Sequence, residues 1–201
     1  MKKLIVISHP DILPHESVLL TAALDAGADY LHLRKPHAKA EDIAQLLQEL
    51  SAAHRAKVVL HDAHHLAQEY GVGGIHLNSR HPQLPQGWQG RTSRSCHTLE
   101  EIERYKNEYD YLLLSPIYNS ISKSGYNSAF TTEQLAEAQS HKIIDDHVIA
   151  MGGITPDNVT ATLSYGFSGV AVLGCLWSNL TIEHISDTIK NIKEQLLCYN
   201  S

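Results

Sequence analysis

The pair Gly152 and Gly153 is a place in this chain where a ligand could bind. It follows a strand-like apolar run at 148–151 and precedes Thr155 and Pro156, which suit the N-cap and the first position of a helix. Glycines let a ligand approach the backbone, and N–H groups at the start of a helix can hold a phosphate. An isolated Gly-Gly pair, however, is more often a tight turn without a ligand.

A second glycine-bearing strand end strengthens the phosphate interpretation. The run 170–173 is strand-like and ends at Leu173, which Gly174 follows. Two such strand ends near the C-terminus are typical of the phosphate site of a (β/α)8 barrel. The pattern therefore predicts that Gly152, Gly153, Leu173 and Gly174 bind a phosphate group.

Alternation within the segment 30–34 places a histidine and an arginine inside the predicted barrel. If Leu31 and Leu33 face outward onto helices, His32 and Arg34 face inward. Arg34 would then lie at the rim, where active sites of this fold occur. An inward arginine is costly without an anion, which favours a function. The alternative is that His32 and Arg34 satisfy each other.

Four further residues end predicted strands with groups suited to acid/base chemistry or ligand binding. His61 and His76 would be inward imidazoles that exchange protons near neutral pH. Asp62 could hold a metal or orient a ligand, and a surface helix N-cap is the alternative. Ser95 is a candidate hydrogen-bond donor at the end of the fifth strand.

A polar loop after the sixth predicted strand carries Ser120, Ser122 and Lys123. The lysine could reach over the barrel mouth to a phosphate, and an ordinary exposed lysine is the alternative. His64 and His65 follow His61, but the strand end lacks the helical spacing of a zinc motif. We therefore expect His64 and His65 to be surface histidines.

Strand-like and helix-like segments alternate along the whole chain. The predicted strands are 4–8, 30–34, 58–61, 74–77, 91–95, 111–115, 148–151 and 170–173. The predicted helices are 16–26, 40–53, 64–70, one opening with a capping box at 98–101, one with a capping box at 131–134, 156–165 and 182–197. Eight βα units predict an α/β fold, a (β/α)8 TIM barrel, over a single domain at 1–201. A doubly wound open sheet suits this repeat count less well.

The composition bounds the function classes. A formal net charge of −6 argues against a general nucleic-acid binder. The chain has no apolar run long enough to span a membrane. The apolar run near its start is too short for that of a signal peptide. Three widely spaced cysteines give neither a disulfide framework nor a zinc motif. These features predict a cytoplasmic protein, and they leave a homo-oligomer open.

Taken together and in this order, the strand-end residues resemble the thiamine phosphate synthase/TenI family. The resemblance covers nearly the whole chain. The motifs that carry it are 31–34, 59–62, 74–77, 95–98, 111–123 with Ser-Pro-Ile-Tyr at 115–118, 150–154 and 169–173.

The resemblance implies a (β/α)8 barrel that acts on the thiazole phosphate half of thiamine. In the synthase, a carbocation from the pyrimidine diphosphate is captured by the thiazole nitrogen, and Mg²⁺ with basic residues stabilises the departing pyrophosphate. In the TenI branch, the barrel isomerises a thiazole carboxylate phosphate by proton transfer.

Departures from the synthase pattern concentrate on its magnesium-pyrophosphate half. Where the synthase pattern is Gln-Leu-Arg-Glu-Lys, this chain has His-Leu-Arg-Lys-Pro at 32–36. The first Gln and the final Lys of the pattern are therefore missing, and Lys35 lies one position before the place of that final Lys. Asp62 retains one magnesium ligand, but His81 stands where the synthase has the second carboxylate. Histidine is a poor replacement because Mg²⁺ prefers oxygen ligands. The Thr-x-Thr-Lys pattern is Ser-Ile-Ser-Lys at 120–123. Where TenI has a catalytic histidine after strand six, this chain has Pro116, as a synthase does.

These observations predict an enzyme of thiamine biosynthesis, either a divergent synthase (a transferase) or a TenI-like tautomerase (an isomerase). The catalytic candidates are Arg34, Ser95, Lys123, His32, His61 and His76. The substrate-binding candidates are Ser120, Ser122, Gly152, Gly153, Leu173 and Gly174, and Asp62 is the candidate Mg²⁺ or pyrimidine ligand. A catalytically silent barrel that binds a phosphate ligand is the alternative from another class, and a sugar-phosphate isomerase or epimerase on the same fold is a further enzyme option.

Overall fold

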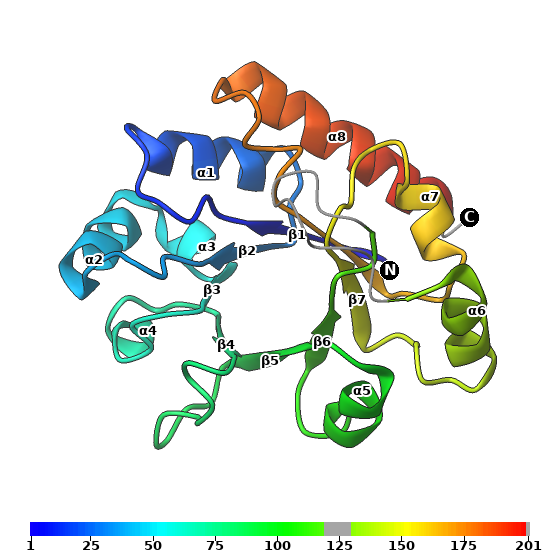
Figure 1. The fold of residues 1–201 in the computed structure, drawn as a ribbon. Coiled ribbons are helices and arrows are strands. Elements are labelled where there is room, and N and C mark those ends of the chain that lie inside the picture. Colours follow the sequence, from blue (N-terminus) through cyan, green and yellow to red (C-terminus); the bar gives the residue numbers. More distant parts are fainter. Residues whose placement is uncertain (119–129, 200–201) are drawn as a thin grey trace.

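The computed structural model describes residues 1–118 and 130–199, which form a closed parallel barrel surrounded by helices (Figure 1). Its strands are β1 (Lys3–Ile7), β2 (Tyr30–Leu33), β3 (Val58–Leu60), β4 (Gly74–Leu77), β5 (Arg91–Cys96), β6 (Tyr111–Leu114), β7 (Val148–Met151) and β8 (Gly169–Val172). They pair in sequence order, and β8 closes on β1. The predicted TIM barrel is confirmed.

Helices on the outside cover the strands. They are α1 (Glu16–Asp25), α2 (Ala40–Glu49), α3 (Ala52–Arg55), α4 (Leu66–Glu69), α5 (Leu99–Tyr105), α6 (Thr132–Ser140), α7 (Val159–Leu163) and α8 (Ile182–Tyr199). The apolar stripe Ile185, Ile189, Ile192 and Leu196 of α8 is buried, as the spacing of an amphipathic helix requires. Among the described helices, none is long and apolar enough to cross a membrane.

Side-chain bonds to the backbone explain where two predicted helices differ. The helix predicted from Pro156 begins only at Val159, because the Asn158 side chain accepts from Thr155 N–H at 2.9 Å and donates to the Gly153 carbonyl at 2.9 Å. Such local bonds hold a turn in place of a helical start. The segment predicted as one helix at 40–53 divides because Ser51 caps α3.

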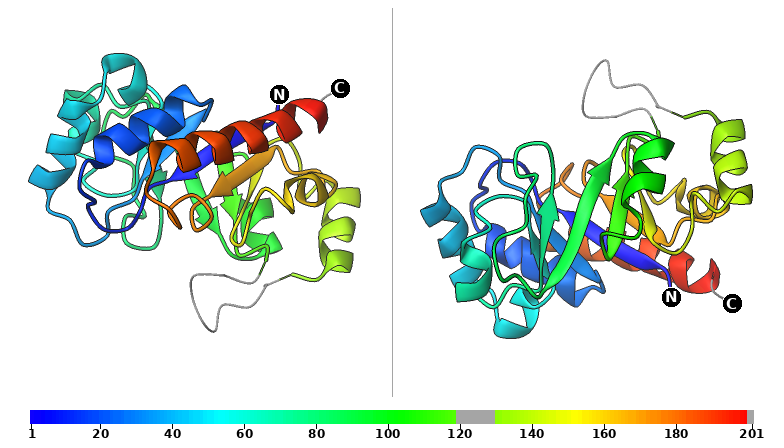
Figure 2. Two further views of the ribbon diagram at one scale, coloured as in Figure 1. Left: turned by 90° about the horizontal axis from the view of Figure 1, so that it is seen from above. Right: turned by 90° about the horizontal axis from the view of Figure 1, so that it is seen from below.

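Closure of the barrel depends on tight backbone contact between β1 and β8. Lys3 and Gly169 are paired there, and a Cβ on Gly169 would lie 2.1 Å from the Lys3 carbonyl oxygen. The start of β1 lies near the end of α8 (Figure 2), and Lys2 Nζ is 5.6 Å from the centre of the Tyr199 ring.

The interior of the barrel divides into an apolar half and a polar half. The apolar half comes from β1, β6, β7 and β8 and contains Ile5, Ile7, Leu113, Ile149 and Ala171. The polar half comes from β2 to β5 and contains the buried side chains of His32, His61, His76 and Ser93. TIM-barrel interiors are usually filled by bulky branched residues, so the polar half is the unusual one.

Burial keeps the three interior imidazoles neutral. Desolvation, with a smaller contribution from the Arg91 charge, lowers the pKa of His32 to about 3. Desolvation likewise holds the pKa values of His61 and His76 well below the ordinary range, and the neighbouring histidines act in the same direction. Each ring therefore has one N–H donor and one lone-pair acceptor at neutral pH.

We predict that the free energy of unfolding falls as the pH drops below about 6.5. Between that value and the lowered pKa of the folded state, the unfolded chain binds protons that the buried histidines do not. Each histidine can contribute up to about 1.4 kcal/mol per pH unit. Urea denaturation of the wild type at several pH values should show this slope, and His76→Gln should reduce it. The exposed His65, changed to Gln, is the control, and equal slopes in wild type and His76→Gln would contradict the prediction.

We also predict that Gly169→Ala destabilises the barrel by at least about 2 kcal/mol, because the new methyl group overlaps the backbone of Lys3. Gly71→Asn is the matched control, since open space surrounds Gly71 and Asn tolerates its positive φ of 64°. Chemical denaturation measures both, and a stable Gly169→Ala protein would show that the β1–β8 contact can relax.

Candidate active site

A cavity of about 470 Å³ opens at the C-terminal ends of the strands. The predicted phosphate residues Gly152, Gly153, Leu173 and Gly174 line it, and so do Arg34, His61 and Ser95. His32, His76 and Asp62 do not line the cavity. Ser120, Ser122 and Lys123 lie outside the described residues, so their roles stay predictions.

The glycine turn after β7 requires residues without a side chain. Gly152 has a φ of +97° and Gly153 a φ of +66°, values that favour glycine. A Cβ on Gly152 would lie 2.8 Å from Pro116 Cα. The Gly152 carbonyl accepts the Tyr118 N–H at 3.1 Å. The turn is therefore fixed against the chain after β6, while its role in phosphate binding stays a prediction.

Arg34 offers a positive charge to the cavity from the end of β2. Its backbone is fixed to Ser8, whose hydroxyl oxygen accepts the Arg34 N–H at 2.9 Å. Within the described residues, its guanidinium has no hydrogen-bond partner. Burial and the neighbouring Arg80 charge lower the pKa of Arg34, while Asp62 raises it. The alternative in which His32 and Arg34 satisfy each other is wrong, because His32 bonds elsewhere.

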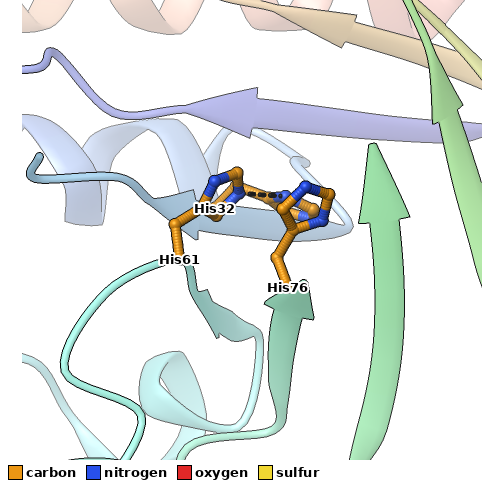
Figure 3. Close-up of side chains that lie close together, drawn as sticks. All are labelled: His32, His61 and His76. Carbon is orange, nitrogen blue, oxygen red and sulfur yellow. Dashed lines mark hydrogen bonds between the residues drawn. The ribbon is translucent and has the colours of Figure 1, made fainter. Parts of the chain in front are cut away.

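The interior histidines point toward one another (Figure 3). His32 Nδ1 is 2.8 Å from His61 Nε2, and His32 Nε2 is 2.6 Å from the Tyr111 hydroxyl. The rings of His61 and His76 stack with centroids 4.0 Å apart. His61, which directly follows β3, is the member of this group that reaches the cavity.

Ser95 and Ser93 hold the third imidazole from β5. His76 Nδ1 is 2.8 Å from Ser93 Oγ, and His76 Nε2 is 2.8 Å from Ser95 Oγ. Because Ser95 also lines the cavity, its hydroxyl connects the cavity to a buried histidine. Ser93 and Ser95 therefore lie on the same face of β5.

His97 is a cavity residue that the sequence analysis did not select. Its Nδ1 is 3.0 Å from the Ser115 carbonyl oxygen, which can only accept a hydrogen bond, so Nδ1 carries the proton when the ring is neutral. The lone pair then lies on Nε2, as a general base requires. The signal available in the sequence was its spacing of two residues from Ser95, which predicts the same face of an extended chain.

Asp62 is buried and already bonded to other protein groups. Its Oδ2 accepts the Lys35 N–H at 3.0 Å, and its Oδ1 accepts Arg80 Nη2 at 2.9 Å. His81 Nε2 lies 3.5 Å from the same Oδ1. Asp62 is therefore not an exposed helix cap, and Arg80 is a second functional candidate that the sequence analysis missed.

These contacts do not fit a magnesium ion. A guanidinium lies where a cation bound by Asp62 would lie, and the adjacent side chain His81 offers nitrogen, whereas Mg²⁺ prefers oxygen ligands. The groups of three ligating side chains found among the described residues are His32–His61–His76 and Asp145–Asp146–His147, and neither includes Asp62.

Two further expectations concern Lys35 and His64. Lys35 cannot act as a substrate cation, because it is buried and its ammonium donates to Glu16 and to the carbonyls of His9 and Asp11. His65 is exposed, as expected for a surface histidine, but His64 is half-buried. The prediction was wrong for His64, whose ring packs 5.3 Å from that of His81.

Comparison with known proteins agrees with the resemblance noted in the sequence. A family model described as thiamine monophosphate synthase matches residues 4–176. A thiamine-phosphate synthase of Limosilactobacillus fermentum is 28% identical over 188 residues, which cover 86% of this chain and 84% of the relative.

Solved structures give the same result. A thiamine phosphate pyrophosphorylase from Bacteroides thetaiotaomicron superposes with a TM-score of 0.86 and 36% identity over 97% of both chains. One from Pyrococcus furiosus, at a TM-score of 0.79 and 21% identity, covers 99% of this chain and 97% of its own and shows the shared fold. With a family model spanning β1 to β8 and a relative of 36% identity over almost the whole length, the chain belongs to the thiamine monophosphate synthase family.

Proposed function

We propose that this chain is an enzyme of thiamine biosynthesis that isomerises thiazole carboxylate phosphate by proton transfer, as a TenI-like tautomerase. The observation that carries the proposal is the contrast between two parts of one site. Three proton-transfer groups, His61, Ser95 and His97, line the cavity. The carboxylate that a magnesium-dependent synthase would use is bonded to Arg80 instead.

The phosphate of the ligand is assigned to the glycine turns. Gly152 and Gly153 lie at the cavity wall opposite the histidine-bearing strands, with Gly174 next to them on the loop after β8. Arg34 supplies a positive charge without a protein partner among the described residues. This arrangement orients the ring of a phosphate ligand toward β2–β5, where the imidazoles lie.

His97 is proposed as the general base. The family resemblance places the TenI histidine directly after the sixth strand, where this chain has Pro116. His97 reaches the same region from the loop after β5, since its ring bonds the carbonyl of Ser115. Its Nε2 would take a proton from one atom of the thiazole, and a cavity-lining donor would return a proton at another.

A divergent synthase is the second candidate, and the names of the relatives favour it. In that case Arg34 and Arg80, two residues that line the cavity, would neutralise the departing pyrophosphate in place of Mg²⁺. A silent phosphate-binding barrel is the third outcome. The three candidates predict different outcomes when the purified protein is given these substrates: an isomerised thiazole, thiamine phosphate, or binding without turnover.

We expect the purified protein to isomerise thiazole carboxylate phosphate and to release no pyrophosphate when given both synthase substrates with Mg²⁺. Adding EDTA should leave the isomerisation rate unchanged, because Arg80 already engages Asp62. The products are separable by chromatography and ³¹P NMR. Thiamine phosphate formation would refute the tautomerase and establish the synthase, and thiazole phosphate binding without turnover would leave the silent binder.

We further expect His97→Gln to lower the isomerisation rate about 10²- to 10⁴-fold, the usual contribution of a positioned general base. Thiazole phosphate affinity, measured by calorimetry, should change little, because Gln keeps a polar side chain of similar size. His141→Gln is the control, since His141 is exposed at the end of α6. Equal rates in His97→Gln and wild type would remove His97 from the mechanism.

A further inference from the structure

The buried polar groups of the barrel form two hydrogen-bonded arms that together make one chain. The first arm runs from the cavity through His61, His32 and Tyr111 by contacts of 2.8 and 2.6 Å. The second arm runs back toward the cavity from Ser93 through His76 to Ser95 by contacts of 2.8 Å each. Tyr111 and Ser93 are paired across β5 and β6, which brings the two arms together.

Strand register explains why these groups meet. His76 is paired with Ser93 across β4 and β5, and Ser93 with Tyr111 across β5 and β6. Side chains at paired positions of parallel strands point to the same face, here the barrel interior. His32 enters the same layer from β2, where its ring centre is 5.3 Å from that of His76.

Both ends of the chain reach the same cavity, whereas its middle does not. His61 and Ser95 line the cavity, while His32, His76 and Ser93 are fully buried. A buried polar network that served stability alone would not need to reach the cavity at both ends. We infer that this hydrogen-bonded chain of side chains is a proton relay. It carries a proton between two points of a bound ligand through the interior of the barrel.

Every member can donate one hydrogen bond and accept one, so the chain has two complete arrangements. In the first, Ser95 donates to His76, His76 to Ser93, Ser93 to Tyr111, Tyr111 to His32 and His32 to His61. In the second, every donor and acceptor is exchanged. The imidazoles are neutral in both, which matches their burial.

One proton shift converts the first arrangement into the second. His61 Nδ1 gives its proton to one ligand atom, and its Nε2 receives the proton of His32. Each preceding group passes one proton along in the same way, and Ser95 Oγ takes the proton that His97 Nε2 has removed from a second ligand atom. The ligand loses one proton and gains one, no redox change occurs, and all protein groups end neutral.

This inference deepens the proposed function, because a ligand that is isomerised by moving a proton between two ring positions can use such a path. It names the substrate class as a planar heterocycle whose two exchanging atoms face His61 and His97, next to Ser95. After the product leaves, water in the cavity gives a proton to His61 Nδ1 and accepts one from Ser95 Oγ, and the shift runs back through the chain to reset the relay.

Tyr111→Phe breaks the relay at its middle and leaves both cavity-lining ends in place. We expect the isomerisation rate to fall at least tenfold with little change in ligand affinity. In H₂O/D₂O mixtures the wild-type rate should fall non-linearly with deuterium content, because several protons move together, and the variant should lose that curvature. Tyr30→Phe is the matched control, since its ring stacks on Tyr111 with centroids 5.7 Å apart. Ser93→Ala breaks the adjacent link and replaces Tyr111→Phe if that variant does not fold.

A measurement without substrate separates the relay from the proposed function. In ¹⁵N NMR spectra, Ser95→Ala should shift the tautomer balance of His32, which lies in the other arm of the chain, and should not do so in the Tyr111→Phe background. That coupling supports the relay even if the protein turns over no thiazole. Absence of the coupling, or wild-type rates and curvature in Tyr111→Phe, would overturn the relay while leaving the tautomerase to be judged by its own product.

Discussion

The hydrogen bond between His32 and His61 is the interaction on which the polar half of the barrel depends. An unpaired imidazole nitrogen at this depth would cost about 1–3 kcal/mol, and His32 has no water-exposed alternative. Its second nitrogen is satisfied by Tyr111, which belongs to β6, a strand of the apolar half. The pairing therefore fixes the orientation of His61 at the cavity floor, and with it the geometry that the ligand meets.

Much of the fold could be predicted because its signals are local. Alternating apolar segments gave the βα order, and the two-residue period of the segment at 30–34 correctly placed Leu31 and Leu33 outside and His32 inside. The start of α7 could not be predicted, since it depends on the Asn158 side chain bonding the backbone of its own turn. Asn and Pro at such positions are compatible with either a turn or a helix.

The site was less predictable because it depends on contacts between segments far apart in the sequence. His61, Ser95 and the glycines were expected at the rim from strand ends alone. That Arg80 would bond Asp62 follows from the path of the loop after β4, and the role of His97 follows from the Ser115 carbonyl beside it. Neither contact produces a repeating pattern of residues in the sequence from which it could be predicted. The replacement of a carboxylate by His81 did show in the sequence, and the Arg80 guanidinium gives it a physical meaning.

The division of the interior also separates the chain into two half-barrels. The proton-transfer groups come from β2 to β5, while the glycine turns follow β7 and β8. Neither half holds a complete site, so on the proposed function a phosphate ligand contacts both halves across the mouth of the barrel. Ligand binding would then stabilise the contact between the halves. Binding of the ligand and closure of the barrel would be thermodynamically linked.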